Sequence, residues 1–328
     1  MREYPFVMGS AVPGRSRRAL GALALLVVPS VIAAIPLVPL SVLLGPTGFG
    51  FTPTGALGGL LVAPIVGVGG SVLTGPILVD RRIARLPEAT LDDRPAGFVA
   101  DRITTLAADV GVDPPAVTVV RADAANVAVV DGYRGAQLII STRLLSLPQD
   151  DRDAALRHAL VRLRMRQALV TTALIPALAA VETVALVATL LVGRSDDRTA
   201  GDRRVNRIHG YEPERQRIPP WAYTGGGVLL WLLILPAWLP ALIGDRLYVA
   251  GGRQAADVAV ARAGTTERTG LGNAVAFASD AAGAADWPPL LDRLSLVSMA
   301  DAKTGRVRGI SRHEPRIRLA LLRSKRAL

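Results

Sequence analysis

Residues 20–44 read LGALALLVVPSVIAAIPLVPLSVLL and contain no charged side chain. A helix of this length exceeds the roughly 20 residues that are needed to cross the hydrocarbon core of a membrane. A secretory signal peptide would instead have a shorter apolar core, followed by a cleavage site of small residues. The stretch therefore predicts a helix that crosses a membrane.

Three more apolar runs follow the first, at residues 54–79, 168–192 and 221–243. Hydrophobic residues make up 50% of the 328, and the mean hydropathy is +0.36, which is high for a soluble protein. The uncharged residues 45–53 join the first two runs, so these two runs are interpreted as a hairpin. Composition and pattern together predict a multi-pass membrane protein.

Basic residues flank this hairpin at both ends, with Arg17 and Arg18 before it and Arg81 and Arg82 after it. Because positive charge stays on the cytoplasmic side, the N-terminus and the residues from 80 onward are predicted to lie in the cytoplasm, beneath the cell membrane. Residues 194–217 disagree, because they hold seven arginines but would lie outside after three crossings. A shallow re-entrant hairpin formed by the last two runs is the alternative to four full spans.

Residues 80–166 are interpreted as a soluble domain. Its pattern predicts a helix at 95–110, β-strands at 116–120, 126–130 and 137–141, and two turns, at Asp131-Gly132 and Arg134-Gly135. A further helix begins at Pro148 and passes through His158, and we expect it to continue into the third apolar run. The expected segments are a basic N-terminus (1–19), the two-span hairpin (20–79), the soluble domain (80–166), a third span (167–193), a charged loop (194–219), a fourth span (220–243) and a C-terminal helical part of the domain with a basic tail (244–328).

Several classes of chemistry are excluded by composition. The chain has no cysteine, which excludes disulfides, thiolate metal sites and a cysteine nucleophile, and it has only 3 histidines. Its net charge of +11 is best explained by basic flanks that face anionic lipid. Aromatic residues are only 4% and do not alternate with the basic ones, so nucleic-acid binding is not expected.

A series of short motifs carries a resemblance to a known family. In chain order the motifs are VGVDPP at 110–115, VTVV at 117–120, ANVAVVDG at 125–132, LIISTRLL at 138–145, RHALVRLR at 157–164, RQAAD at 253–257 and SRHEPRI at 311–317. Their order resembles that of the HtpX-type and CAAX-prenyl-protease group of membrane zinc metallopeptidases, over most of the chain from residue 20. The resemblance implies an α+β, mainly helical multi-pass membrane protein with a zincin-related cytoplasmic domain, of a kind that serves protein quality control.

The resemblance aligns RHALVRLR with the family's His-Glu-x-x-His motif and RQAAD with its Glu-x-x-x-Asp motif. In the family, two histidines on one helix face bind zinc, and the glutamate between them takes a proton from the zinc-bound water. The glutamate of the second motif is the third ligand, and one position stays open for water. The implied cofactor of the family is therefore zinc.

This chain departs from the family pattern at the positions that matter for chemistry. His158 matches the first ligand, and Asp257 matches the family's supporting aspartate. Ala159, however, replaces the general base, while Arg162 and Arg253 replace the other two ligands. Because arginine stays protonated and offers no lone pair to a metal, we expect no zinc and no intact catalytic set, which makes the chain a pseudopeptidase.

Zinc in the family also joins the helix before the third span to the helix after the fourth. We expect Arg162 and Arg253 to bridge these helices through ion pairs centred on Asp257, which follows Arg253 by four residues. Two arginines and one acid imply a second anion, for which Glu314, a lipid phosphate and the C-terminal carboxylate of a partner are candidates. The alternative is that both arginines face solvent or lipid headgroups.

Three other residues are candidates for weaker reasons. Asn126 corresponds to a residue that supports the substrate strand or a turn in the family, although an ordinary turn residue is an equal interpretation. His313 is a candidate cleft residue, but no spacing predicts that it joins His158 and His209 in a metal site. Glu182 lies within an apolar run, where a carboxylate marks either a proton or ion path or a neutral or paired structural acid.

Three functions are consistent with these observations. The first is a non-catalytic membrane factor that binds a protein partner or a damaged membrane-protein substrate through the former cleft. The second is an active zinc metalloendopeptidase of membrane-protein quality control with unusual ligands. The third is a transporter or channel that uses Glu182. Membrane lipid is an expected partner in each case.

Overall fold

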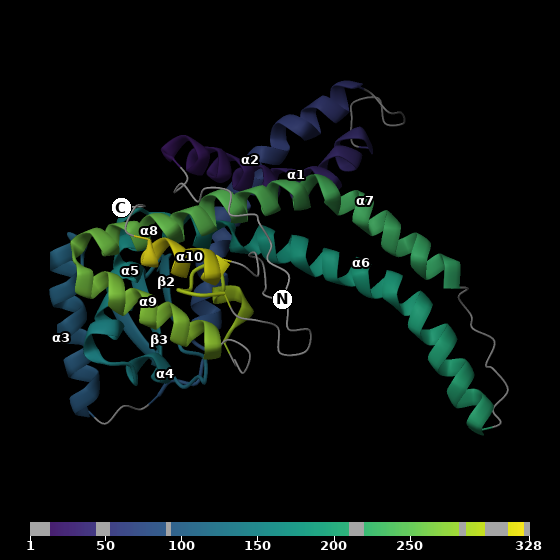
Figure 1. Ribbon diagram of the computed structural model, residues 1–328. Helices are drawn as coiled ribbons and strands as arrows, with labels where there is room; N and C mark the ends of the chain where they lie inside the picture. The colour runs from purple at the N-terminus through teal and green to yellow at the C-terminus, as the bar shows by residue number, and fades with distance from the viewer. Residues whose placement is uncertain are drawn as a thin grey trace. The chain divides into compact units, whose positions relative to one another are not determined.

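The computed structural model describes residues 14–43, 53–89, 93–209, 220–281, 287–298 and 314–324, which are mainly helical (Figure 1). The long helices are α1 (Arg15–Leu43), α2 (Pro53–Ile83), α6 (Gln167–His209) and α7 (Pro220–Gly244). The shorter helices are α3 (Asp93–Val110), α4 (Thr142–Leu145), α5 (Gln149–Arg164), α8 (Gly251–Ala263), α9 (Thr265–Asp280) and α10 (Glu314–Arg323). The chain forms two compact units, one of Met1–Leu26, Gly70–Ile175 and Leu242–Leu328, the other of Val27–Gly69 and Pro176–Ala241.

Four helical stretches are long and apolar enough to cross a membrane. They are Arg15–Leu40, Leu57–Ile83, Gln167–Val192 and Ala222–Ala263. Many of their large apolar side chains are exposed, including Leu61 (75%), Ile65 (74%) and Leu229 (67%). Apolar surface on this scale is unusual for a soluble protein and suits contact with lipid. The finding supports the prediction of a multi-pass membrane protein.

Helices α2 and α6 pack closely at a glycine. A Cβ atom built on Gly75 would lie only 2.4 Å from the backbone oxygen of Thr172, so no larger residue fits without movement of the backbone. The hydroxyl of Ser71, one helical turn earlier, donates to the backbone oxygen of Ala173 at 2.9 Å. Small residues at such an interface let two helices approach, as is common between membrane-spanning helices.

The strands form one three-stranded sheet in the order β1-β3-β2. β1 (Ala116–Val120) runs parallel to β3 (Gly135–Ser141), and β2 (Val127–Gly132) runs antiparallel to β3. These strands lie where the alternating pattern predicted them. The two predicted turns are wrong, because Asp131, Gly132 and Gly135 belong to the strands and one tight turn at Tyr133 and Arg134 joins them. Gly135 has φ of +88°, a conformation that glycine adopts without strain.

Helix α5 lies at the centre of the unit that contains the sheet. It packs against β2 and against α3, α8 and α9, while α10 packs on α8 and α9 (Figure 1). One continuous apolar core links these elements, with Ile103 of α3, Ile139 of β3 and Leu160 of α5 among its fully buried members. The core therefore surrounds the helix that carries His158.

Two helix boundaries differ from the prediction. α5 does not continue into the third apolar run, because Arg166 has φ of +54° and a new helix begins at Gln167. This break lets the buried Gln167 side chain bond with Arg162 on one side and with the backbone oxygens of Tyr248 and Val249 on the other. α6 in turn remains helical through His209, across much of the predicted loop, since no proline occurs between residues 177 and 212.

Candidate functional site

Asp257 on α8 is fully buried and receives an arginine from the C-terminal helix. Nε and a terminal nitrogen of Arg318 donate to the two carboxylate oxygens at 2.7 and 2.8 Å. Nε2 of His158, on α5, lies 3.2 Å from the same carboxylate. The group thus ties together α5, α8 and α10, three elements that are far apart in the sequence.

Arg253, one turn before Asp257 on α8, is also fully buried. One of its terminal nitrogens donates to both carboxylate oxygens of Glu314 at 2.8 and 3.1 Å and to the hydroxyl of Ser298 at 2.9 Å. The other terminal nitrogen donates to the backbone oxygen of Asp292. Glu314, one of the three candidates for a second anion, is thus the acid that pairs with Arg253.

Arg162 on α5 makes no ion pair among the described residues, and its partners are neutral oxygens. It donates to the backbone oxygens of Arg293, Leu294 and Ser295 at 2.7 to 2.9 Å and to the side chain of Gln167 at 2.9 Å. Burial, together with the positive charges of Arg253 and Arg318, lowers the pKa of Arg162 well below its usual value. Its four hydrogen bonds oppose that effect, since each requires a donor.

These residues form what we call the arginine cluster, namely Arg162, Arg253, Arg318, Asp257, Glu314 and His158. All three arginines donate to backbone oxygens of residues 292–296, because Arg318 also donates to the backbone oxygen of Leu296. The cluster therefore has two effects, since it joins three helices and fixes the segment 292–296, which begins as a turn.

That segment lies along the outer edge of the sheet. The backbone nitrogen of Val129 in β2 donates to Leu294, and that of Leu296 donates back to Val127 at 2.8 Å. Asn126, which is fully buried, strengthens the contact, because its side chain donates to the backbone oxygen of Val297 and accepts from the nitrogen of the same residue. Asn126 is thus more than a turn residue, since it holds residues 294–297 against β2.

His158 is neutral at physiological pH. Burial, offset only in part by the hydrogen bond and charge of Asp257, lowers its pKa to about 4. Its Nε2 lies near two acceptors, the Asp257 carboxylate at 3.2 Å and the backbone oxygen of Arg253 at 3.3 Å. A terminal nitrogen of Arg318 lies 3.4 Å from the same atom, but this nitrogen donates to Asp257 at the shorter distance of 2.8 Å. We therefore assign the ring proton to Nε2, whereas Nδ1 is buried without a partner among the described residues.

The residues at this place do not fit a zinc ion. A zinc site needs several lone pairs that converge within about 2.3 Å of one point. Nε2 of His158 instead donates to Asp257, and the two other positions of the family's ligands present guanidinium groups, which carry no lone pair. Within the described ranges no three His, Cys, Asp or Glu side chains are grouped as metal ligands would be.

The remaining predicted residues do not converge on this cluster in the described part of the chain. Ala159 is buried and contributes to the apolar core. Glu182 lies exposed on α6, six residues after Pro176, and His209 ends the same helix. His313 lies outside the described residues.

The predicted pairing within the cluster needs one correction. Arg253 and Arg162 are buried as expected, but neither bonds with Asp257, whose arginine is Arg318. Arg318 was not a candidate, although it follows the SRHEPRI motif directly. Its position immediately after this motif is the only signal in the sequence.

Comparisons with known proteins add nothing to this picture. No family model, no curated protein and no solved structure matches the chain.

Proposed function

We propose that the chain is a membrane-embedded homologue of the HtpX-type metallopeptidases that lacks peptidase activity and acts as a binding or regulatory factor in the membrane. The resemblance of its motifs, in their order along the chain, supports the family. The observation that carries the loss of activity is the burial of Arg162 and Arg253, both hydrogen-bonded, beside His158. No base stands at Ala159 to activate a water molecule.

The edge of the sheet gives independent support. A peptidase that holds its substrate in an extended conformation needs a free strand edge with which the substrate can pair. Here the outer edge of β2 already bonds with Leu294 and Leu296 of the same chain. Because Asn126 and three arginines hold that segment, displacement by a substrate would break many hydrogen bonds at once.

The orientation in the membrane is part of the same proposal. Arginines precede the first apolar run and follow the second, while residues 45–53 between them are uncharged. The positive-inside tendency then favours a cytoplasmic position for the sheet and its surrounding helices.

Zinc content and proteolysis of the detergent-purified protein test the proposal. We expect no stoichiometric zinc and no cleavage of casein or of an unfolded membrane protein, because the base and two ligands together supply most of the rate in such sites. Near-equimolar zinc that disappears in His158→Ala would refute the proposal. His209→Ala is the matched control, since zinc lost equally in both variants would be bound nonspecifically.

A further inference from the structure

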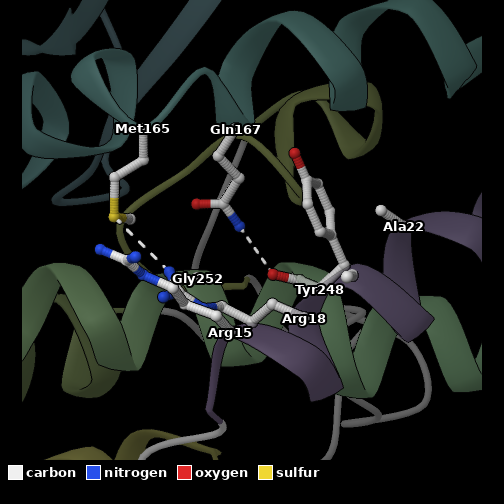
Figure 2. Close-up of a pocket in the computed structure, with 8 residues that line it drawn as sticks. Arg15, Arg18, Ala22, Met165, Gln167, Tyr248 and Gly252 are labelled. Carbon is white, nitrogen blue, oxygen red and sulfur yellow. Dashed lines mark hydrogen bonds between the residues drawn. The ribbon is translucent and has the colours of Figure 1, made fainter.

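A small pocket lies at the end of α1, apart from the arginine cluster. It has a volume of about 150 Å³ and is lined by side chains from α1, by Met165 and Gln167 at the α5–α6 break, and by Tyr248 and Gly252 (Figure 2). This space is large enough for several water molecules. A phosphate group fits such a space.

Close packing of α1 creates this pocket. A Cβ atom on Gly21 would lie 2.7 Å from the backbone nitrogen of Tyr248, so only glycine lets α1 approach the π-helical turn Asp245–Ala250 this closely. The approach places Arg18, about one turn before Gly21, and Arg15, nearly two turns before it, beside Gly252 in the lining of the pocket. Figure 2 shows both arginine side chains extending from α1 toward Met165.

The pocket contains positive charge without a matching acid. Two of its lining residues are arginines and none is acidic. One terminal nitrogen of Arg18 reaches only the sulfur of Met165, at 3.8 Å, which is a weak acceptor. Nε of Arg18 is buried and has no hydrogen-bond partner among the described residues. A buried donor of this kind is costly unless an acceptor occupies the pocket.

The surroundings indicate where such an acceptor comes from. Arg15 and Arg18 lie at the N-terminal end of the first candidate span, and Leu20 and Leu23, further along the same helix, are 56% and 64% exposed. If α1 crosses the membrane, the arginines lie at the level of the lipid headgroups and the leucines at the level of the acyl chains. Guanidinium groups bind phosphate oxygens through paired hydrogen bonds.

We propose that this pocket binds a phosphate group through Arg15 and Arg18, and that the headgroup of an anionic membrane lipid supplies it. The site does not depend on the proposed function, because its residues are separate from the positions of the family's zinc ligands. Gln167 is common to the pocket and the surroundings of the arginine cluster, since it lines the pocket and also accepts a hydrogen bond from Arg162.

Native mass spectrometry of the detergent-purified protein tests the site with two lipids that differ only in the phosphate group. Phosphatidic acid should bind about tenfold more tightly than diacylglycerol with the same chains, since one hydrogen bond to a charged group is worth about 1.5 kcal/mol or more. Arg18→Gln should lower the ratio of the two affinities about tenfold. Arg15→Gln should also lower this ratio, and because Arg15 is exposed we expect the variant to fold normally. Arg17→Gln, an exposed neighbour outside the pocket, should leave the ratio within about twofold.

Inorganic phosphate in excess distinguishes the two sources of the ligand. If inorganic phosphate displaces phosphatidic acid at a concentration similar to that of the lipid, the pocket binds phosphate and its ligand is soluble. If the lipid stays bound, the pocket binds the phosphate of the lipid headgroup. Equal binding of both lipids, or the same loss in Arg17→Gln as in Arg18→Gln, would overturn the proposal. Unfolding temperatures of all variants establish that each one is folded.

Discussion

Asp257 has no contact with water, and its charge depends on three side-chain donors, two from Arg318 and one from His158. Removal of one partner from a buried ion pair leaves the other charge uncompensated. Asp257→Asn should therefore lower the free energy of unfolding by about 3–5 kcal/mol, as measured by denaturation in detergent.

Asp109→Asn is the matched control for this substitution. Asp109 pairs with Arg157 at 2.9 Å, but its side chain is 53% exposed. Exposed pairs of this kind contribute less than about 1 kcal/mol. Equal effects of the two substitutions would mean that the buried pair does not stabilise the protein as we describe.

His158 makes the same region sensitive to acid. Its pKa is about 4 in the folded protein and near 6.5 in the unfolded chain, so the unfolded chain binds the proton first as the pH falls. The contribution of neutral His158 to stability is fully present above pH 6.5. The free energy of unfolding should fall by about 3 kcal/mol as the pH decreases from 6.5 to 4. Asp257, Arg318 and Arg162 are the charged groups around the ring.

Denaturation across that pH range, compared with His158→Gln, measures this contribution. The variant keeps a donor for Asp257 but has no group that titrates there. Its stability should depend on pH less steeply than that of the natural protein. Parallel curves for the two proteins would show that His158 does not cause the acid sensitivity.

Local spacing accounts for only part of the cluster. The sequence predicted that Arg253 and Asp257 share a helix face, and both are buried in the same cluster. It could not predict which acid each arginine binds, because the partners Glu314 and Arg318 each lie 61 residues further along the chain. Three of the four acceptors of Arg162 are backbone oxygens more than 130 residues away, which no pattern of side chains reveals.

At the scale of elements, the contact between α2 and α6 depends on Gly75. Gly75→Ala should destabilise the protein by about 1–3 kcal/mol, because the added methyl group meets the backbone of α6 and neither helix yields easily. Gly70→Ala is the control on the same helix, since a Cβ atom there meets nothing within 4 Å. In detergent, Gly75→Ala should unfold at a clearly lower temperature than Gly70→Ala. Similar unfolding temperatures would contradict close packing at Gly75.

The strands and the apolar helices could be predicted from the sequence because their periodicity is local. β1 and β3, for example, begin and end within two residues of their predicted limits. Residues 287–298 have no such signal, since their conformation depends on bonds with β2 and with the arginine cluster. The segment that covers the sheet edge was therefore found only in the structure.

At the scale of the whole molecule, orientation in the membrane is directly testable because the chain contains no cysteine of its own. Single cysteines at Ser146 and Thr266, both exposed, should resist an impermeant thiol reagent added to intact cells. A cysteine at Thr47, in the uncharged stretch between the first two runs, should react.

A permeant thiol reagent is the control for these positions, and it should label all three variants. Protection of Thr47→Cys together with labelling of Ser146→Cys would reverse the proposed orientation. Labelling of Thr266→Cys alone would instead mean that the third and fourth runs do not return the chain to the same side.

The two buried ion pairs of α8, Arg253 with Glu314 and Asp257 with Arg318, also determine when folding can be completed during synthesis. Arg253 and Asp257 leave the ribosome 61 residues ahead of Glu314 and Arg318, a delay of about 3–12 seconds at ordinary elongation rates. During that interval both charges lack their buried partners, so burial of α8 is unfavourable. Closure must wait for the last helix, and a nascent chain that stops before Glu314 would expose its unfinished interior to proteases and chaperones.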